Sequence, residues 1–248
     1  MKKLVKVLAL AAVMMFGAQA MAQTSGTMFL GASFPMGNFG KGEIENLDNN
    51  WALLNSDLDN RYAGASIGAN VGLKWKFGIG VPGLGVMLSL DGFYNGLNND
   101  LKEYFDERVI HMKNDPLVKS YTLNRPKFIN VPLMVGLNQT FYLTPSFGIY
   151  LEGGLGCNAR FITQYSEEIQ YVAIATATTA YKFKPAFSFA YQFGTGFEIS
   201  KKFVIGASFY DLGGSKVVAE RTQLVTDMYK NEKGVRPMMV LVRIGFKF

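Results

Sequence analysis

The last twelve residues of the chain, 237–248, constrain its fold more than any other stretch. Every second residue is apolar, from Met238 to the final Phe248, and Arg243 and Lys247 lie among the residues between them. A period of two predicts a β-strand with one apolar and one polar face. A soluble domain seldom ends its polypeptide on such a strand with a terminal aromatic residue, so the closing segment already favours an unusual all-β architecture.

The same alternation recurs in seven earlier segments, which makes eight expected strands. They are residues 28–34, 63–77, 84–94, 128–141, 147–161, 187–199, 203–212 and 237–248. Most are long enough to cross a bilayer, because a strand tilted by about 45° needs about 9–11 residues. Pro132 lies inside the fourth segment and cannot donate to a ladder, so we expect a bulge or a missing hydrogen bond there.

The connections between these strands alternate between long and short, beginning with a long one. This pattern is typical of transmembrane barrels, which have short turns at one end and long loops at the other. Residues 78–83 spell G-x-G-x-x-G, the dinucleotide-binding fingerprint, but no helix or βαβ unit follows, so we interpret them as a tight turn. Within the long connections, residues 97–112 fit a short amphipathic helix and residues 171–183 fit an extended hairpin.

Residues 1–22 have the pattern of a secretory signal peptide. Three lysines precede a short apolar run, and an A-x-A pattern ends at Ala22, with a cut after Ala20 as the alternative. A retained transmembrane helix is disfavoured, because the apolar run is shorter than the roughly 18 residues that such a helix needs. We therefore expect export and a mature domain of residues 23–248.

Composition narrows the possible functions. The formal net charge of +6 falls to about +3 once the three lysines of residues 1–22 are subtracted. So small an excess, without a Lys/Arg run, gives no indication of nucleic-acid binding. Cys157 is the only cysteine, so the chain has no internal disulfide framework, and we interpret this residue as a small apolar filler on a strand.

A soluble barrel such as a lipocalin, with its apolar face inward, is the main alternative. The polar face of the expected strands consists mostly of Gly, Ser and Asn, with few charges of either sign. Small residues suit a cramped lumen better than a solvated exterior, and a closed barrel satisfies the backbone pairing that lipid demands. Aromatic residues near the strand ends predict two belts at the membrane interfaces. We predict an all-β, eight-stranded antiparallel up-and-down transmembrane β-barrel with four long external loops and three short periplasmic turns.

Three segments carry a family resemblance: F-I-N-V-P-L-M-V-G (128–136), F-G-T-G-F-E (193–198) and L-V-R-I-G-F-K-F (241–248). They resemble the outer-membrane β-barrel protein family, in particular small eight-stranded barrels of the OmpA/OmpX type that are common in Bacteroidetes. The resemblance covers essentially the whole mature chain. It implies a bacterial outer-membrane location and assigns Phe246 and Phe248 to a C-terminal assembly signal.

The same resemblance implies the partners and the function classes. The expected partners are outer-membrane lipid and lipopolysaccharide, the barrel-assembly machinery and other envelope proteins. The expected function is non-enzymatic, with a structural or surface-interaction role. A narrow porin for small solutes is one alternative. A membrane subunit of a secretion or assembly complex is another, because the PorT-like component of a secretion system has a similar build.

Strand parity places eight charged residues inside the barrel: Lys74, Lys76, Asp91, Glu152, Arg160, Glu198, Arg243 and Lys247. Eight strands leave an interior just wide enough for side chains. An unpaired ion there would cost several kcal/mol, so we expect the carboxylates to pair with lumen bases, with Glu152 and Glu198 around Arg243. We interpret this network as a structural plug, with a gated path for small solutes as the alternative.

Catalysis, cofactors and metals find little support in the sequence. His111 is the only histidine, with Asp115 four residues later, and no H-E-x-x-H, G-x-S-x-G or Cys/His pattern appears. Some outer-membrane barrel enzymes place a histidine and acidic partners near the outer rim, but a lipid acyltransferase needs an apolar lumen, and we expect this lumen to be polar. The long connections carry bases that could face lipopolysaccharide phosphates: Lys102, Arg108, Lys113, Lys119, Arg221, Lys230 and Arg236.

Overall fold

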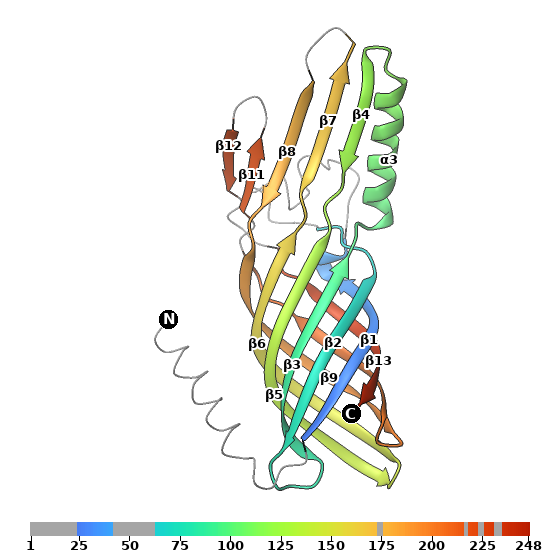
Figure 1. The fold of residues 1–248 in the computed structure, drawn as a ribbon, viewed down its shortest axis with the longest axis vertical. Coiled ribbons are helices and arrows are strands. Elements are labelled where there is room, and N and C mark those ends of the chain that lie inside the picture. The colour runs from blue at the N-terminus through green and yellow to red at the C-terminus, as the bar shows by residue number, and fades with distance from the viewer. Residues whose placement is uncertain (1–23, 42–62, 173–175, 216–217, 223–225, 231–234) are drawn as a thin grey trace.

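The computed structural model describes residues 24–41, 63–172, 176–215, 218–222, 226–230 and 235–248, so the expected signal peptide lies outside the described residues. Eight strands form a closed barrel: β1 (Thr24–Met36), β2 (Gly68–Gly78), β3 (Leu84–Asn95), β5 (Phe128–Thr144), β6 (Phe147–Ile162), β9 (Ala186–Ile199), β10 (Phe203–Asp211) and β13 (Met238–Lys247). Their order around the barrel is β1-β13-β10-β9-β6-β5-β3-β2, with every pair antiparallel (Figure 1). The predicted eight-stranded up-and-down barrel is confirmed.

The wall of the barrel carries its apolar side outward. Phe189, Phe193 and Ile244 are 64%, 59% and 64% exposed, whereas Glu152 and Arg243 are 3% and 1% exposed. A soluble barrel would bury the former group and expose the latter, because apolar surface is removed from water on folding. The orientation predicted from the alternation is therefore confirmed, and the lipocalin-like alternative is wrong.

Three short connections lie at one end of the barrel, which we call the short-turn end; the opposite end is the long-loop end (Figure 1). The G-x-G-x-x-G segment is the turn between β2 and β3, as expected. Gly80 and Gly83 have φ angles of +85° and +76° there, which favours glycine. At the connection between β9 and β10, the Lys202 N–H donates to the Ile199 carbonyl at 3.1 Å, and Ser200 and Lys201 between them have the positive φ angles, +54° and +56°, that a type I′ turn requires.

Two details of the predicted strands need comment. The stretch 63–67 is not part of β2, which begins at Gly68. Instead, the backbone N–H groups of Ala63 and Ala65 donate to carbonyls of Asn38 and Phe39 at 2.9 and 2.8 Å, so this stretch folds over the long-loop end. Its alternation of small residues reflects burial under that end rather than a transmembrane wall.

The second detail is Pro132 on β5. The β5–β6 pairing runs through it without a shift, with Pro132 opposite Asn158. On the other side, the β3–β5 pairing skips Val131 and Pro132 and then resumes in the same register. The predicted loss of ladder pairing at this proline is therefore confirmed on the β3 side. The β5–β6 ladder has no bulge at Pro132.

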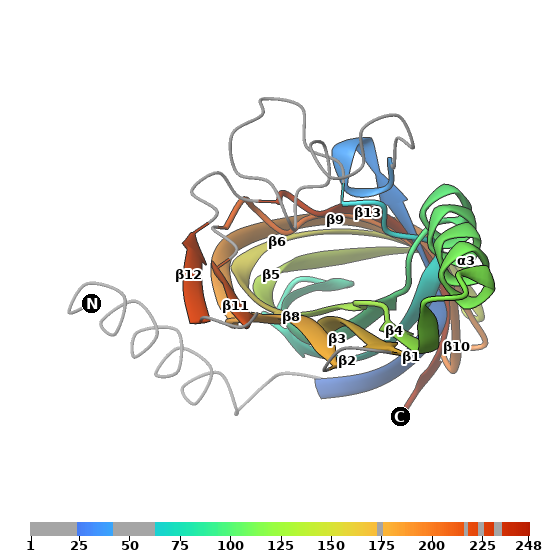
Figure 2. The same ribbon diagram turned by 90° about the horizontal axis from the view of Figure 1, so that it is seen from above.

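A second, five-stranded sheet rises from the long-loop end. Its order is β12 (Thr226–Lys230), β11 (Val218–Thr222), β8 (Ala177–Phe183), β7 (Tyr165–Tyr171) and β4 (Val118–Asn124). Seen from above, it follows one side of the barrel opening, with α3 (Asn99–Asn114) at its β4 end (Figure 2). The expected hairpin at 171–183 is the β7–β8 hairpin, which begins earlier, but the prediction of loops at β4, β11 and β12 was wrong. No helix among the described residues is long and apolar enough to cross a membrane.

Helix α3 confirms the helix predicted at 97–112, shifted by two residues. Asn98 caps its start, because its side-chain oxygen accepts a hydrogen bond from the Leu101 N–H at 3.0 Å. Asp100 lies in the first turn and Lys113 in the last, where each charge suits the helix dipole. Leu101 and Phe105, four residues apart, are buried and attach the helix to the structure beneath it.

Candidate functional site in the barrel lumen

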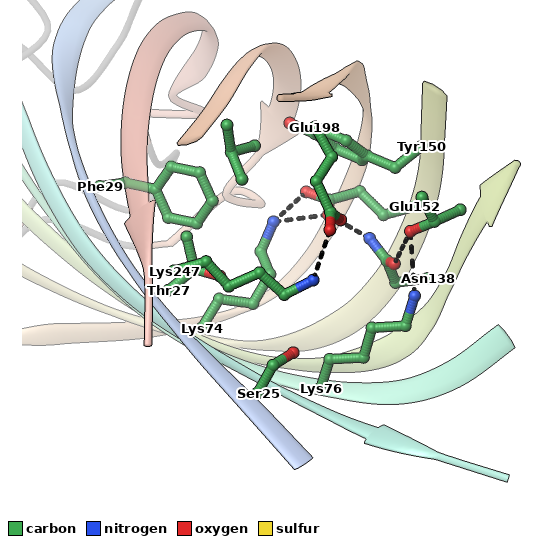
Figure 3. Close-up of a pocket in the computed structure, with 12 residues that line it drawn as sticks. Ser25, Thr27, Phe29, Lys74, Lys76, Asn138, Tyr150, Glu152, Glu198 and Lys247 are labelled. Carbon is green, nitrogen blue, oxygen red and sulfur yellow. Dashed lines mark hydrogen bonds and ion pairs between the residues drawn. The ribbon is translucent and has the colours of Figure 1, made fainter. Parts of the chain in front are cut away.

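Four charged side chains from four different strands meet in the middle of the lumen, and we call them the charge cluster: Lys74, Asp91, Glu152 and Arg243. Arg243 donates from Nη1 to Asp91 Oδ1 at 3.0 Å and from Nη2 to Glu152 Oε1 at 3.0 Å. Lys74 Nζ donates to the same Glu152 oxygen at 2.7 Å (Figure 3). Two cations thus face two anions, which is the compensation that buried charges require.

Neutral side chains complete the surroundings of the charge cluster. Ser208 Oγ accepts a hydrogen bond from Arg243 Nη2 at 3.1 Å, and Asn138 Nδ2 donates to Glu152 Oε2 at 3.1 Å. The Phe29 ring lies 4.4 Å from the guanidinium carbon of Arg243 and 4.7 Å from Lys74 Nζ. A ring face attracts cations, so Phe29 supports both bases from the β1 side.

The pairing of Glu198 differs from the expectation. Glu198 accepts a hydrogen bond from Lys247 Nζ at 2.8 Å instead of binding Arg243. The register places both bases within similar reach, because across β10 Glu198 is level with Gly245 on β13, midway between Arg243 and Lys247. Arg243 is already held by the charge cluster, so Glu198 takes the base on the side of the short-turn end.

The two remaining lumen bases have partners other than carboxylates. Lys76 Nζ donates to the Gly83 carbonyl at 2.6 Å and to Thr140 Oγ1 at 3.1 Å. Arg160 is fully buried near the long-loop end. In the part of the chain that the structure describes, its partners are two backbone carbonyls, of Val235 and Gly213, and the Asn130 amide. Arg160 therefore ties together the ends of the connection between β10 and β13.

The long-loop half of the lumen is filled by apolar side chains, which we call the apolar plug: Phe39, Phe93, Leu97, Leu101, Phe105, Phe128, Met134, Ile162, Tyr210, Leu212, Met239 and Leu241. The Phe39 and Phe128 rings meet edge to face at 5.3 Å, and Phe93 meets Tyr210 at 5.2 Å. Tyr210 donates from its hydroxyl to Asp91 Oδ2 at 2.8 Å, which joins the apolar plug to the charge cluster.

The expectation of a lumen that is polar throughout is therefore wrong for this half. The signal was present in the sequence, because Met239 and Leu241 share the inward face of β13 with Arg243. Phe93 likewise shares the inward face of β3 with Asp91. Strand parity read for every inward residue, and not only for charged ones, would have predicted an apolar layer at the long-loop end.

Open space in the lumen lies toward the short-turn end. A cavity of about 30 Å³, bordered by Lys74, Tyr150 and Glu152, has room for about one water molecule (Figure 3). Beyond it, a vestibule of about 820 Å³ is lined by Lys76, Glu198, Lys247 and the adjoining turns. The lumen is thus open at the short-turn end and filled by the charge cluster and the apolar plug above it.

Other residues singled out by the sequence lie outside the lumen. His111 is exposed near the end of α3, beside a shallow hollow that includes Asp115. The described residues contain no group of three His, Cys, Asp or Glu side chains that could hold a metal ion. Cys157 is exposed on the outer wall. Phe246 packs against Phe203 with ring centroids 5.8 Å apart, and an assembly role for Phe246 and Phe248 stays a prediction.

A second polar network lies in the sheet beyond the barrel. Arg108 of α3 binds both carboxylate oxygens of Glu167 on β7, at 2.9 and 3.1 Å, and Tyr121 of β4 donates to Glu167 at 2.8 Å. Burial and the Glu167 carboxylate raise the pKa of Tyr121 to about 12. Although partial burial lowers it, the carboxylate raises the pKa of Arg108 above its usual value. Arg108 therefore fastens α3 to the sheet, and a contact between it and lipopolysaccharide stays a prediction.

Comparisons with known proteins give one family match and several similar solved structures. A family model described as "outer membrane protein beta-barrel domain" matches residues 8–248. Among solved structures, OprG from Pseudomonas aeruginosa is 14% identical with a TM-score of 0.46, and the match covers 93% of this chain and 98% of that one. Ail of Yersinia pestis is 14% identical with a TM-score of 0.42, and the match covers 92% and 99%. A major outer membrane protein from Thermus thermophilus is 11% identical with a TM-score of 0.43, and the match covers 91% and 100%. A search of curated proteins found no match.

Proposed function

The chain belongs to the outer membrane protein beta-barrel domain family, and we propose that it is a non-enzymatic, non-conducting outer-membrane barrel with a structural or surface-interaction role. The observation that carries this proposal is the apolar plug, which fills the long-loop half of the lumen. An ion or solute that passed the charge cluster from the short-turn end would meet a packed layer of rings, and the nearby buried Arg160 already bonds to Asn130 and to backbone carbonyls. Moving an ion from water into such an apolar layer is strongly unfavourable.

The charge cluster supports a structural role for the lumen. Arg243, Asp91, Glu152 and Lys74 come from β13, β3, β6 and β2, so their contacts link strands across the barrel. Each of the four has an oppositely charged partner. A conducting path would need these contacts to break and the apolar plug to move, which makes the filled barrel the favoured state.

The long-loop end supports the surface-interaction part of the proposal. Long loops of such barrels are external and short turns are periplasmic. In that orientation the five-stranded sheet and α3 stand on the cell-surface side of the membrane (Figure 1). Binding residues are commonly placed on segments that a rigid scaffold holds in position. The barrel would thus anchor and orient an exposed sheet-and-helix unit.

Conductance in planar bilayers tests the proposal against the narrow porin. The wild-type barrel is expected to give no steady single-channel steps. A variant that combines Phe39→Ala and Phe128→Ala in the apolar plug with Lys74→Ala and Glu152→Ala in the charge cluster opens space in both layers and is expected to give steps that the wild type lacks. Phe187→Ala, on the outer wall, is the matched control and should stay silent. Steady openings of the wild type would overturn the proposal in favour of the porin.

A further inference from the structure

A polar groove lies on the outside of the molecule where the barrel wall passes into the second sheet. We call it the rim groove, with a volume of about 650 Å³, and its lining residues are Leu123, Asn124, Arg125, Lys127, Thr163, Gln164 and Ser166. They lie where β4 continues into β5 and where β6 continues into β7 (Figure 1). The groove therefore sits at the level where the apolar wall ends.

The floor of the rim groove is held by backbone and side-chain hydrogen bonds. Lys127 donates from its backbone N–H to Thr163 Oγ1 at 2.8 Å, and the Thr163 N–H donates to the Lys127 carbonyl at 3.0 Å. Both residues continue outward-facing columns of the barrel, two positions beyond Ile129 and Phe161, which are a cross-strand pair. A lipid-facing surface thus leads directly into the groove.

The groove presents hydrogen-bond donors and positive charge. Lys127 is exposed, with Nζ 5.6 Å from the centroid of the Tyr94 ring, and no carboxylate of the described residues forms an ion pair with it. Arg125 is held by an ion pair with Asp106 on α3. Asn124 donates to Ser166 Oγ at 2.9 Å, and the Gln164 side chain is exposed. An ammonium group, amides and hydroxyls around one groove match phosphate and sugar oxygens.

We propose that the rim groove binds the phosphorylated glucosamine headgroup of lipopolysaccharide, with a phosphate at Lys127 and acyl chains along Tyr94, Ile129 and Phe161. This inference rests on the outer-membrane placement in the proposed function. Aromatic rings mark headgroup depth in membranes, so Tyr94 and Phe161, both partly exposed, place Lys127 at the height of a lipid phosphate. The free ammonium and the apolar wall beneath it are the two parts that an anionic amphiphile needs.

The test uses the full-length mature protein refolded in detergent micelles, with bound lipid measured by native mass spectrometry. The probes are diphosphoryl lipid A, dephosphorylated lipid A, phosphatidylglycerol and inorganic phosphate. Lys127→Gln is expected to weaken binding of diphosphoryl lipid A about threefold to fivefold, the range for an exposed charge contact. Lys202→Gln is the matched control, because Lys202 is an exposed lysine of the β9–β10 turn at the short-turn end, on the opposite side of the membrane.

The outcomes separate the alternatives. A threefold to fivefold weaker binding of diphosphoryl lipid A in Lys127→Gln but not in Lys202→Gln, with weaker binding of the dephosphorylated form to the wild type, supports the site. Equal binding of both lipid A forms, equal binding of phosphatidylglycerol, competition by inorganic phosphate at the same affinity, or an unchanged Lys127→Gln would overturn it. If the wild-type barrel conducted but still bound lipid A through Lys127, the proposal of a non-conducting barrel would be wrong and the proposal of a lipid A site would be supported. The two proposals can therefore fail separately.

Discussion

The two halves of the lumen are filled by the same inward-facing columns but by different chemistry. On β13, Met239 and Leu241 enter the apolar plug, while Arg243 enters the charge cluster and Lys247 reaches the vestibule. The apolar half is stabilised by area removed from water, which tolerates variation in geometry. The charged half depends on each ion having its partner, because desolvation of a lone ion is costly. The difference shows that the apolar plug closes the lumen, whereas the charge cluster links strands across it.

Removing the central base gives the largest expected effect. Arg243→Leu leaves Asp91 and Glu152 buried with Lys74 as their remaining base, and we expect a loss of about 3–5 kcal/mol in the free energy of unfolding. Urea titration followed by heat-modifiable gel migration measures this loss. A double variant that adds Asp91→Asn removes the carboxylate left without a base, keeps Lys74 paired with Glu152, and should recover part of it. A loss below about 1 kcal/mol in Arg243→Leu would contradict the account of the charge cluster.

The apolar half should respond to lost volume rather than lost charge. Phe128→Ala removes a fully buried ring that packs on Phe39, and we expect a loss of about 3 kcal/mol in the free energy of unfolding. Phe128→Leu keeps most of the volume and should retain more than half of that stability. The same urea titration compares the two variants. Equal losses in both would mean that packing is not what holds this half together.

The pair at the mouth of the vestibule should matter much less than the charge cluster. Lys247 is only partly buried beside Glu198, so Lys247→Met is expected to cost about 1 kcal/mol, with the effect weakened by salt. Unfolding in low and high salt measures both features. A loss as large as that of Arg243→Leu would contradict the expectation that a partly buried ion pair contributes less to stability than the fully buried charge cluster.

The smallest expected effect lies outside the lumen and depends on pH. Because the pKa of Tyr121 is raised from 10.0 to about 12, the folded state favours the protonated phenol. Its contribution to stability is full below pH 10 and is lost as the pH rises through about 12. The difference in absorbance at the phenolate band between wild type and Tyr121→Phe reports this titration. A midpoint near 10 would contradict the hydrogen bond to Glu167.

Much of the barrel could be predicted from the sequence because its signal is local. The period of two in β6 and β13 determines which side chains face inward, so the burial of Glu152 and Arg243 was predictable. The ion-pair partners were harder to predict than burial. The position of Glu198 along the barrel relative to Arg243 depends on how β10 pairs with β9 and with β13. No local pattern encodes that register.

The second sheet was harder to predict than the wall. Its strand β4, V-K-S-Y-T-L-N, is short, and its outward residues are polar, so it resembles a loop in composition. It is held by contacts with β7 and by the bond between Tyr121 and Glu167, which is 46 positions away in sequence. Arg160 was correctly placed inside the barrel, but its backbone-carbonyl partners come from distant connections that carry no sequence signal.

Sided chemical labelling tests the closed lumen most directly. Ser25 borders both the small cavity and the vestibule, so Ser25→Cys in a Cys157→Ser background places one thiol below the charge cluster. The variant is reconstituted in liposomes in one orientation, established by protease access to the second sheet. We expect a small, charged thiol reagent to label it from the short-turn side and not from the long-loop side. Labelling at similar rates from both sides would contradict the account.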